Sequence, residues 1–128
     1  MSGQDRLLLD THVFLWWRAD SPRLRPEIRG KVGAAGLVYV SAASAWEGTI
    51  KAALGKLRLP GPFSVGVAES RFEQLPVTFE HAEAVAELPG HHRDPFDRLL
   101  IAQARCEGLV VVTHDQRFRA YDVPVLWV

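Results

Sequence analysis

The sequence lacks the features that would tie it to a membrane, an oxidising compartment or a polyanionic surface. It has one cysteine, Cys106, so no disulfide can form within the chain, and we expect a reducing, cytoplasmic location. No apolar run approaches the roughly 18–20 residues of a membrane span, and we expect neither a signal peptide nor a membrane partner. Fifteen basic residues balance fifteen acidic ones, which excludes a uniformly basic coat but leaves room for a local basic rim.

Several catalytic signatures are also missing. The chain has no GxxxxGK[ST] or GxGxxG stretch, so nothing supports a nucleotide-binding P-loop or a dinucleotide fingerprint. It has five histidines but no HExxH motif and no Cys/His ligand spacing, so the zinc signal is weak. Ser41 and Ser44 lie outside any GxSxG nucleophile elbow. The acidic residues are therefore the main candidates for chemistry.

The chain alternates between short apolar runs and helical patterns. Its length and its hydrophobic content of 48% fit one globular domain over residues 1–128. Apolar runs without polar alternation suit parallel strands covered on both faces. The alternation predicts right-handed βαβ units and an α/β fold, a three-layer α/β/α sandwich around a mostly parallel β-sheet. The expected strands are 6–10, 37–40, 75–77, 109–113 and 123–128, and the expected helices are 11–17, 26–35, one ending at 54, 63–72, one capped by Thr78 and reaching 88, 95–107, and one or two turns at 116–121.

The stretch Arg93–Ala104 predicts an acidic turn that runs directly into a buried helix. Asp94 suits the N-cap, and Pro95 suits the first helical position, where a missing N–H costs nothing. Asp97 falls in the first turn, where the free backbone N–H groups favour negative charge. The residues that follow are apolar almost all round. These two carboxylates could both be caps, or they could form half of a metal site.

Acidic residues follow the predicted strands where a parallel sheet binds its ligands. Asp10 ends the first strand, and Asp115 lies just past the strand before the C-terminus. Glu47 lies about one helical turn past the second strand, and Asp97 lies in the first turn of the buried helix. Because ligands bind at the carboxyl ends of parallel strands, near a switch in strand order, we expect these four acids to meet at one edge.

Clustered carboxylates favour a hard divalent cation. Each carboxylate raises the pKa of its neighbours through like-charge repulsion, and Mg²⁺ or Mn²⁺ prefers oxygen ligands. Such a metal can activate water, orient a phosphate and stabilise the leaving oxygen, which suits phosphodiester hydrolysis. Thr113, at the end of its strand, could hydrogen-bond a ligand carboxylate and orient it.

Each of these acids also has a structural alternative. Ser44 and Glu47 have the spacing of a capping box, in which Glu47 would only reach back to a backbone N–H. Asp94 is favoured as a cap over a ligand. Asp115 could be a turn or N-cap residue. Asp10 is the hardest to explain structurally, because a carboxylate ending a central strand costs stability unless it is paired.

Four motifs together resemble the PIN domain family, and in particular its VapC-type ribonuclease toxins from bacterial toxin–antitoxin pairs. Each motif is weak alone, but the order and spacing of all four are fairly specific. The resemblance runs from Leu7 to Trp127. The motifs are Leu-Leu-Leu-Asp10-Thr-His, Val40-Ser-Ala-Ala-Ser-Ala-Trp-Glu47, His92-Arg-Asp-Pro-Phe-Asp97-Arg-Leu-Leu-Ile-Ala-Gln-Ala and Thr113-His-Asp115.

The resemblance implies a site, a reaction and partners. Asp10, Glu47, Asp97 and Asp115 would form an acidic quartet with Thr113 as a polar supporter, and Asp10, Asp97 and Asp115 would hold Mg²⁺ or Mn²⁺. The expected activity is hydrolysis of RNA that leaves a 5′-phosphate and a 3′-hydroxyl. The expected partners are the RNA substrate, a cognate antitoxin that occupies an apolar groove and blocks the site, and a second copy of the chain.

Other readings of the same residues stay open. A PIN-like domain without catalysis would only bind RNA or protein. A phosphoacceptor receiver domain is a poorer match, because a single acid ends the first strand and no lysine follows Lys56. Asp94 lies so close to Asp97 that either could lead, and His114 is a candidate substrate contact. Two basic segments could contact phosphates or could simply form solvated helix faces. One contains Arg18, Arg23, Arg25, Arg29 and Lys31, and the other contains Lys51, Lys56 and Arg58.

Trp16 and Trp17 are consecutive, so on a helix they point roughly 100° apart. Both can hardly fill one core site, and one of the two is a candidate for an exposed dimer or antitoxin surface.

Overall fold

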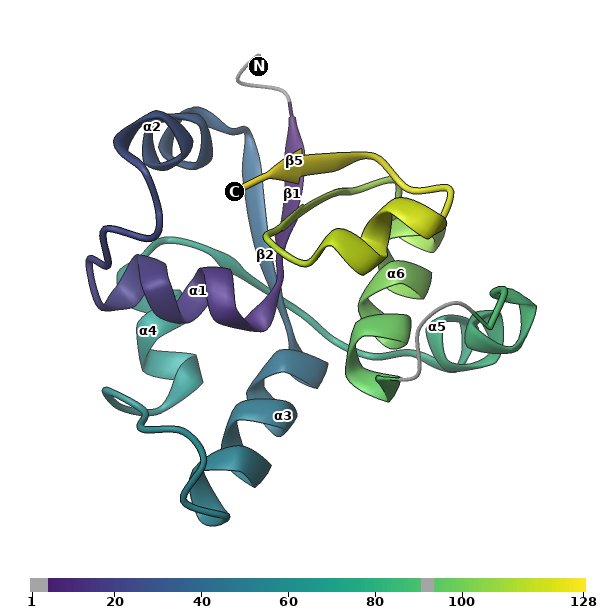
Figure 1. The fold of residues 1–128 in the computed structure, drawn as a ribbon, viewed down its shortest axis with the longest axis horizontal. Coiled ribbons are helices and arrows are strands. Elements are labelled where there is room, and N and C mark those ends of the chain that lie inside the picture. The colour runs from purple at the N-terminus through teal and green to yellow at the C-terminus, as the bar shows by residue number, and fades with distance from the viewer. Residues whose placement is uncertain (1–4, 91–93) are drawn as a thin grey trace.

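One five-stranded sheet, with all strands parallel, forms the middle of the molecule (Figure 1). The computed structural model describes residues 5–90 and 94–128. The strand order is β3-β2-β1-β4-β5, which confirms the predicted parallel sheet and places the first strand at its centre. The strands are β1 (Arg6–Leu9), β2 (Leu37–Ser41), β3 (Glu73–Leu75), β4 (Val110–Thr113) and β5 (Val125–Trp127).

The central strand is apolar on both faces because helices cover both. Leu7, Leu8 and Leu9 are all fully buried. Side chains alternate along a strand, so Leu7 and Leu9 pack into one core cluster and Leu8 packs into the other. Two hydrophobic cores, one on each face of the sheet, make the three-layer α/β/α arrangement that the sequence predicts.

The helices divide between these two faces (Figure 1). Phe14, Ile28 and Val67 come from the helices on the face of Leu7 and Leu9, and Leu100 comes from the opposite face. Helix α3 extends beyond the carboxyl edge of the sheet, where it lies against α1 and α6. The helices are α1 (Thr11–Arg18), α2 (Pro26–Ala34), α3 (Ala42–Ala53), α4 (Phe63–Glu69), α5 (Phe79–Ala84) and α6 (Pro95–Glu107), with 3₁₀ turns at Val85–Glu87 and Gln116–Ala120.

Several predicted boundaries differ from the structure, and three of these differences have a local cause. The third strand lies at the sheet edge and ends before Pro76, which has no N–H to donate. Helix α4 stops at Glu69 because Arg71 takes a left-handed φ of 59°, which turns Phe72 back into the core. Helix α5 stops at Ala84. Just after it, the Arg98 guanidinium donates hydrogen bonds to the carbonyl oxygens of Val85 and Leu88 at 3.1 and 3.3 Å.

The order of the strands creates the crevice that the site occupies. The chain builds outward from β1 through β2 to β3 and then returns to place β4 on the other side of β1. Asp10 follows β1 and donates its backbone N–H to the Val112 carbonyl in β4 at 3.0 Å. The carboxyl ends of β1 and β4 therefore lie side by side at the switch in strand order, where α/β sheets bind ligands.

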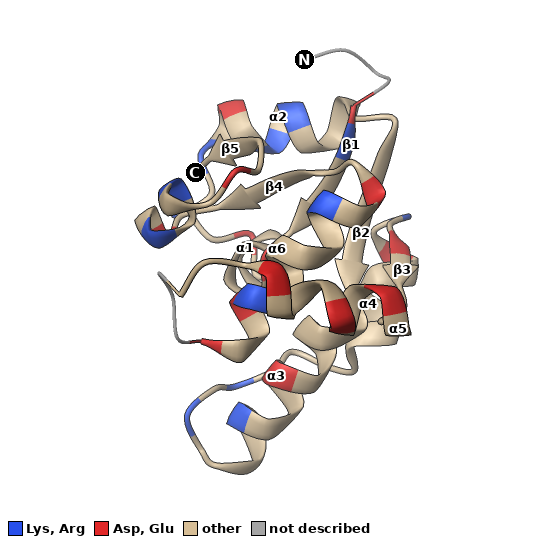
Figure 2. Cartoon of the chain, turned by 90° about the vertical axis from the view of Figure 1, so that its right-hand side faces the viewer, with Lys and Arg blue, Asp and Glu red and all other residues tan. Residues whose placement is uncertain are grey.

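Charge is spread over the chain rather than gathered at one end. Figure 2 shows acidic and basic stretches interspersed along the helices and loops. Within the described part of the chain, no helix is long and apolar enough to cross a membrane.

Candidate acidic active site

A pocket of about 500 Å³ opens at the carboxyl edge of the sheet. It gathers acids from the end of β1, from α3, from the start of α6 and from the segment after β4, as the sequence predicts. Asp94 also lines it. Residues 91–93, which begin the third motif, lie outside the described residues. The lining residues are Asp10, Thr11, His12, Val13, Trp16, Arg23, Glu47, Lys51, Asp94, Asp97, His114, Asp115, Gln116 and Arg117.

Asp10 is held rigidly at the floor of the pocket. It is the N-cap of α1, and its Oδ1 accepts the backbone N–H groups of His12 and Val13 at 2.8 and 3.4 Å. The Thr113 hydroxyl donates to Asp10 Oδ2 at 2.6 Å, so the expected contact between Thr113 and a site carboxylate is present. Burial raises the pKa of Asp10, although these hydrogen bonds and the charge of His12 oppose the shift.

Glu47 is buried and points into the pocket rather than back to its own helix end. Helix α3 begins at Ala42 and is capped by the Ser41 hydroxyl, which accepts the Ala43 N–H at 2.9 Å. The capping-box alternative for Ser44 and Glu47 is therefore wrong, because both residues lie inside the helix. Two oxygens of Glu47 have partners, with the Thr11 hydroxyl 2.6 Å from Oε1 and Lys51 Nζ 2.5 Å from Oε2.

Gly48 lets α3 pack closely behind Glu47. A Cβ atom at this position would lie 2.5 Å from the Phe63 ring, closer than such atoms approach. The glycine therefore costs helix propensity but allows the Glu47 turn to sit tightly against α4.

The two acids at the start of α6 have different surroundings. Asp94 is the N-cap, and its Oδ1 accepts the N–H groups of Phe96 and Asp97 at 2.8 and 3.3 Å, which confirms the predicted cap with Pro95 at the first position. Burial raises the pKa of Asp97 to about 8, together with the charges of Asp94, Asp10, Glu47 and Asp115 in that order. The repulsion of the whole cluster is thus concentrated on Asp97.

Asp115 combines a structural and an electrostatic role. Its Oδ1 accepts the Arg117 N–H at 3.0 Å, so the N-cap alternative is confirmed. The Arg117 guanidinium also grips both carboxylate oxygens, with Nε 3.1 Å from Oδ1 and Nη2 2.9 Å from Oδ2. Asp115 still lines the pocket, and its backbone N–H donates to the Thr113 hydroxyl at 3.0 Å, which joins it to Asp10.

Six pocket residues were not singled out as site residues from the sequence, namely Thr11, His12, Val13, Trp16, Gln116 and Arg117. The spacing of Glu47 and Lys51, four residues apart on a helix, was a readable signal for their ion pair. Among the basic candidates, Arg23 and Lys51 line the pocket, whereas other members of the same segments pair elsewhere. Those pairs are Arg18 with Glu69, Arg29 with Asp20 and Lys31 with Glu27.

The donor set suits a hard cation, although the described residues do not yet enclose one. Within residues 5–90 and 94–128, no group of three or more His, Cys, Asp and Glu side chains is arranged to hold a metal ion. All the acidic donors in the pocket are carboxylate oxygens, which Mg²⁺ and Mn²⁺ prefer. Burial and the charges of the neighbouring carboxylates both raise the pKa of Asp97, and a bound cation would offset both effects.

Comparison with known proteins agrees with this fold. The PIN domain family model matches residues 7–124. Ribonuclease VapC22 of Mycobacterium tuberculosis is 30% identical over 121 residues, which cover 92% of this chain and 93% of the relative.

Two solved structures share the fold at low sequence identity. VapBC2 from Rickettsia felis, bound to a DNA fragment from its promoter, has a TM-score of 0.72 and 15% identity, covering 94% of this chain and 97% of that one. DNA-bound VapBC from Salmonella typhimurium has a TM-score of 0.68 and 22% identity, covering 96% and 98%. From the family match and the relative in M. tuberculosis, we conclude that the chain belongs to the PIN domain family.

Proposed function

We propose that this protein is a metal-dependent endoribonuclease, the toxin of a type II toxin–antitoxin pair, which hydrolyses RNA phosphodiester bonds in the acidic pocket. The observation that carries the proposal is the gathering of acids from four separate segments around Asp97, whose pKa rises to about 8. Such a perturbed group in a pocket is typical of a functional site. The relative from M. tuberculosis is named a ribonuclease, which supports the same chemistry.

The metal would be held by Asp10, Asp97 and Asp115. A divalent cation bound there supplies positive charge beside the scissile phosphate and makes water a stronger nucleophile near neutral pH. Thr113 fixes the position of Asp10 relative to Asp115, because its hydroxyl contacts the Asp10 carboxylate and the Asp115 backbone. These contacts orient Asp10 and the Asp115 backbone, and the carboxylates would draw together around the cation when it binds.

The remaining polar residues act on the substrate. Glu47 is clamped by Thr11 and Lys51, so its carboxylate is positioned to orient a water molecule toward phosphorus. Lys51 and Arg117 lie at the rim on acids of the pocket, where their charges offset the repulsion between the carboxylates and an incoming phosphate. In-line attack would leave a 5′-phosphate and a 3′-hydroxyl.

The proposed protein partner is a cognate antitoxin. The support comes from the solved structures of the same fold, among them VapBC-5 from M. tuberculosis, described as a member of the VapBC family of toxin–antitoxin systems. By the same analogy, we propose that the chain forms a homodimer.

The experiment is an RNA cleavage assay on the purified chain. Structured and single-stranded RNAs are incubated with Mg²⁺, with Mn²⁺ or with EDTA. We expect cleavage only with metal, and a loss of at least about 100-fold in both Asp10→Asn and Asp97→Asn, because first ligands matter more than their supporting residues. Undiminished cleavage by both variants would overturn the assigned site. Metal-independent RNA binding without cleavage of any RNA would favour a catalytically silent PIN-like domain.

A further inference from the structure

One wall of the acidic pocket is aromatic and basic rather than acidic. It consists of His12, Trp16, Arg23 and His114, which line the same pocket as the carboxylates and are here called the Trp16 wall. The Trp16 indole is at its centre. The His114 ring meets it edge-on at a centroid distance of 5.9 Å, the His12 ring lies at 6.5 Å, and the Arg23 guanidinium carbon lies 5.3 Å from the indole centroid.

The Trp16 wall is built on the same frame as the catalytic acids. His12 and Trp16 lie one turn apart on α1, the helix that Asp10 caps. His114 directly follows Thr113, which donates to Asp10. The His114 ring is fixed because Nδ1 lies 3.0 Å from the Val128 carbonyl oxygen, an acceptor, so Nδ1 carries the proton. The distance between this wall and the acids is therefore set by short, well-packed elements.

The neighbouring tryptophan shows what a purely structural tryptophan looks like in this helix. Trp17 donates its indole N–H to the Ser70 hydroxyl at 3.2 Å and packs on Phe72 at a ring distance of 5.2 Å. Arg29 covers its ring at 5.2 Å, and Trp17 does not line the pocket. Trp16 is also half-buried, but one part of it reaches the core while another faces the acids.

We propose that the Trp16 wall is a nucleobase subsite, which holds the base of an unpaired nucleotide beside the scissile phosphate. This inference rests on the proposed ribonuclease function. Every base has a π-face that stacks on an aromatic ring, whereas bases in a duplex are already stacked on one another, so the subsite selects single-stranded RNA. Arg23 and His12 are exposed and offer hydrogen-bond donors to a base edge or a phosphate.

Arg23 covers the Trp16 ring in the free protein and can be replaced there by a nucleobase. In the free protein its guanidinium lies over the Trp16 ring, yet the residue is exposed in the loop between α1 and α2. A base that stacks on the indole takes the place of the guanidinium, which can then turn to the adjacent phosphate. The Arg23 guanidinium and the base therefore compete for the Trp16 ring, but in the complex both groups contribute to binding of the same nucleotide.

The first test measures the affinity for RNA without cleavage. A short, labelled single-stranded RNA is titrated with the Asp97→Asn protein in EDTA, and binding is followed by fluorescence anisotropy. In the Asp97→Asn background, a second substitution, Trp16→Leu, should weaken RNA binding about tenfold, within the range typical of lost base stacking. Trp16→Phe in the same background should keep an RNA affinity within about threefold of Asp97→Asn alone. Thermal unfolding checks that each variant is folded. If Trp16→Leu does not fold, Arg23→Gln and His114→Ala take its place, each with an expected loss of about threefold or more.

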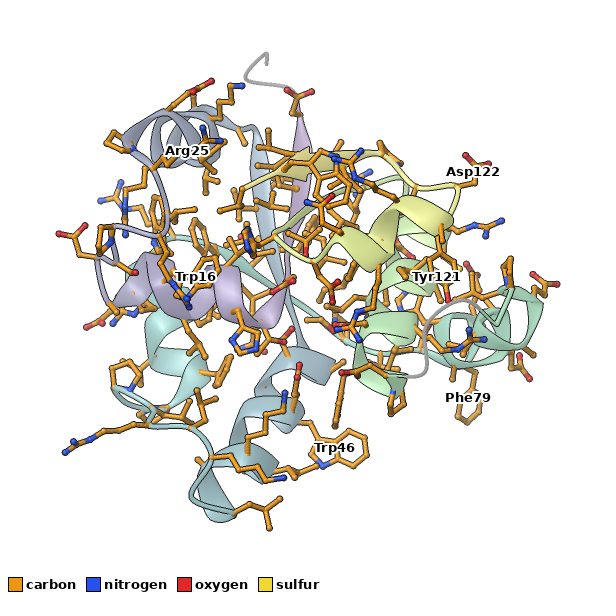
Figure 3. All side chains as sticks on the ribbon, in the orientation of Figure 1. Trp16, Arg25, Trp46, Phe79, Tyr121 and Asp122 are labelled. Atoms are coloured by element: carbon orange, nitrogen blue, oxygen red, sulfur yellow. The ribbon has the colours of Figure 1, made fainter. Side chains whose placement is uncertain are left out.

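The chain offers a matched control in a second tryptophan. Trp46 is 63% exposed on α3, contacts Phe96 at a ring distance of 5.4 Å, and lies outside the pocket. Figure 3 shows Trp16 along α1 and Trp46 projecting outward from α3. Trp46→Leu should bind RNA within about twofold of the parent. Equal losses in the Trp16 and Trp46 variants, or a larger loss for Trp46, would overturn the assignment.

The decisive test asks whether the loss caused by Trp16→Leu and the loss caused by removing one base depend on each other. RNAs with one abasic nucleotide, moved along the strand, are bound to the parent and to Trp16→Leu. At one position the parent should lose about tenfold and the variant should lose nothing further, because the stacking partner is already gone. If the losses from the abasic nucleotide and from Trp16→Leu are independent at every position, the subsite is overturned. It is also overturned if Trp16→Leu keeps its affinity for RNA and instead loses binding of a protein partner.

This design separates the two proposals. Coupling at one base, in a chain that cleaves no RNA with any metal, would support the subsite and overturn the ribonuclease function. Metal-dependent cleavage without coupling at any base would support the ribonuclease function and overturn the subsite.

Discussion

Helix α6 takes part in two polar clusters, the acidic pocket around Asp97 near its start and a buried network around Gln103 further along. In the Gln103 network, donors meet acceptors. Ser41 donates to Gln103 Oε1 at 2.6 Å, and Gln103 Nε2 lies 3.3 Å from Nδ1 of the buried His81. His81 Nε2 in turn lies 2.9 Å from the Glu107 carboxylate. In the pocket, several carboxylates also lie near one another, and burial together with their charges raises the pKa of Asp97 to about 8.

The difference between these clusters separates polar burial for stability from polar burial for chemistry. A hydrogen-bonded network ties α3, α5 and α6 together and gains from every pair it completes. A cluster of like charges costs stability, and strongly perturbed pKa values of this kind gather at functional sites. Burial of polar groups alone would not have distinguished the two regions.

The largest expected effect comes from removing the central acid. Asp97→Asn should reduce metal-dependent cleavage by about 100-fold or more, while the fold becomes no less stable at pH 8, because one source of repulsion is gone. RNA cleavage rates and thermal unfolding measure the two effects. The matched control is Asp94→Asn, which remains a competent cap and should retain more activity. The reverse order would exchange the roles of these two acids.

A smaller loss is expected from Thr113→Val. This change keeps the side-chain shape but removes the hydroxyl that bridges Asp10 and the Asp115 backbone. Cleavage should fall about tenfold, and the Mg²⁺ concentration for half-maximal activity should rise, because supporting residues typically change metal affinity to this extent. A change in stability without any change in the metal requirement would show that Thr113 only supports the fold.

The Gln103 network should respond in the opposite way. Gln103→Leu leaves Ser41 and His81 without their buried partner, so the free energy of unfolding should fall by about 2–3 kcal/mol. The folded protein should cleave RNA within about twofold of the parent rate. Denaturant unfolding measures the loss, with Gln74→Leu on the exposed edge strand as a control expected within about 0.5 kcal/mol. A large loss of activity in folded Gln103→Leu would mean that the two clusters are coupled.

A further prediction concerns how the free energy of unfolding of the metal-free protein depends on pH. The Asp97 pKa is about 8 in the folded chain and about 4 when unfolded, so between these values the folded state binds more protons. The free energy of unfolding should therefore fall as pH rises from about 4 to about 8, and the raised pKa of Asp10 adds to the same slope. Thermal unfolding in EDTA should show a shallower slope in Asp97→Asn. Added Mg²⁺ should stabilise the parent more at pH 8 than at pH 6.

Local patterns determined a large part of this protein. The run of three leucines identified the central strand, because only a strand covered on both faces is apolar without alternation. Asp94 and Pro95 identified the start of α6, since capping depends on residues a few positions apart. The acids that gather in the pocket were found the same way, from their positions after strands in a parallel sheet.

Tertiary structure decided what depends on partners distant in sequence. Helix α3 begins at Ala42 rather than near Ser44, and its packing against α1 brings Glu47 to the Thr11 hydroxyl at 2.6 Å in the pocket. The raised pKa of Asp97 comes first from its burial and then from the neighbouring acids, which four separate segments bring together. Trp16 and Trp17 are neighbours in sequence, but packing alone directs one into the pocket and the other against Phe72, because side-chain direction follows the surface that each residue meets.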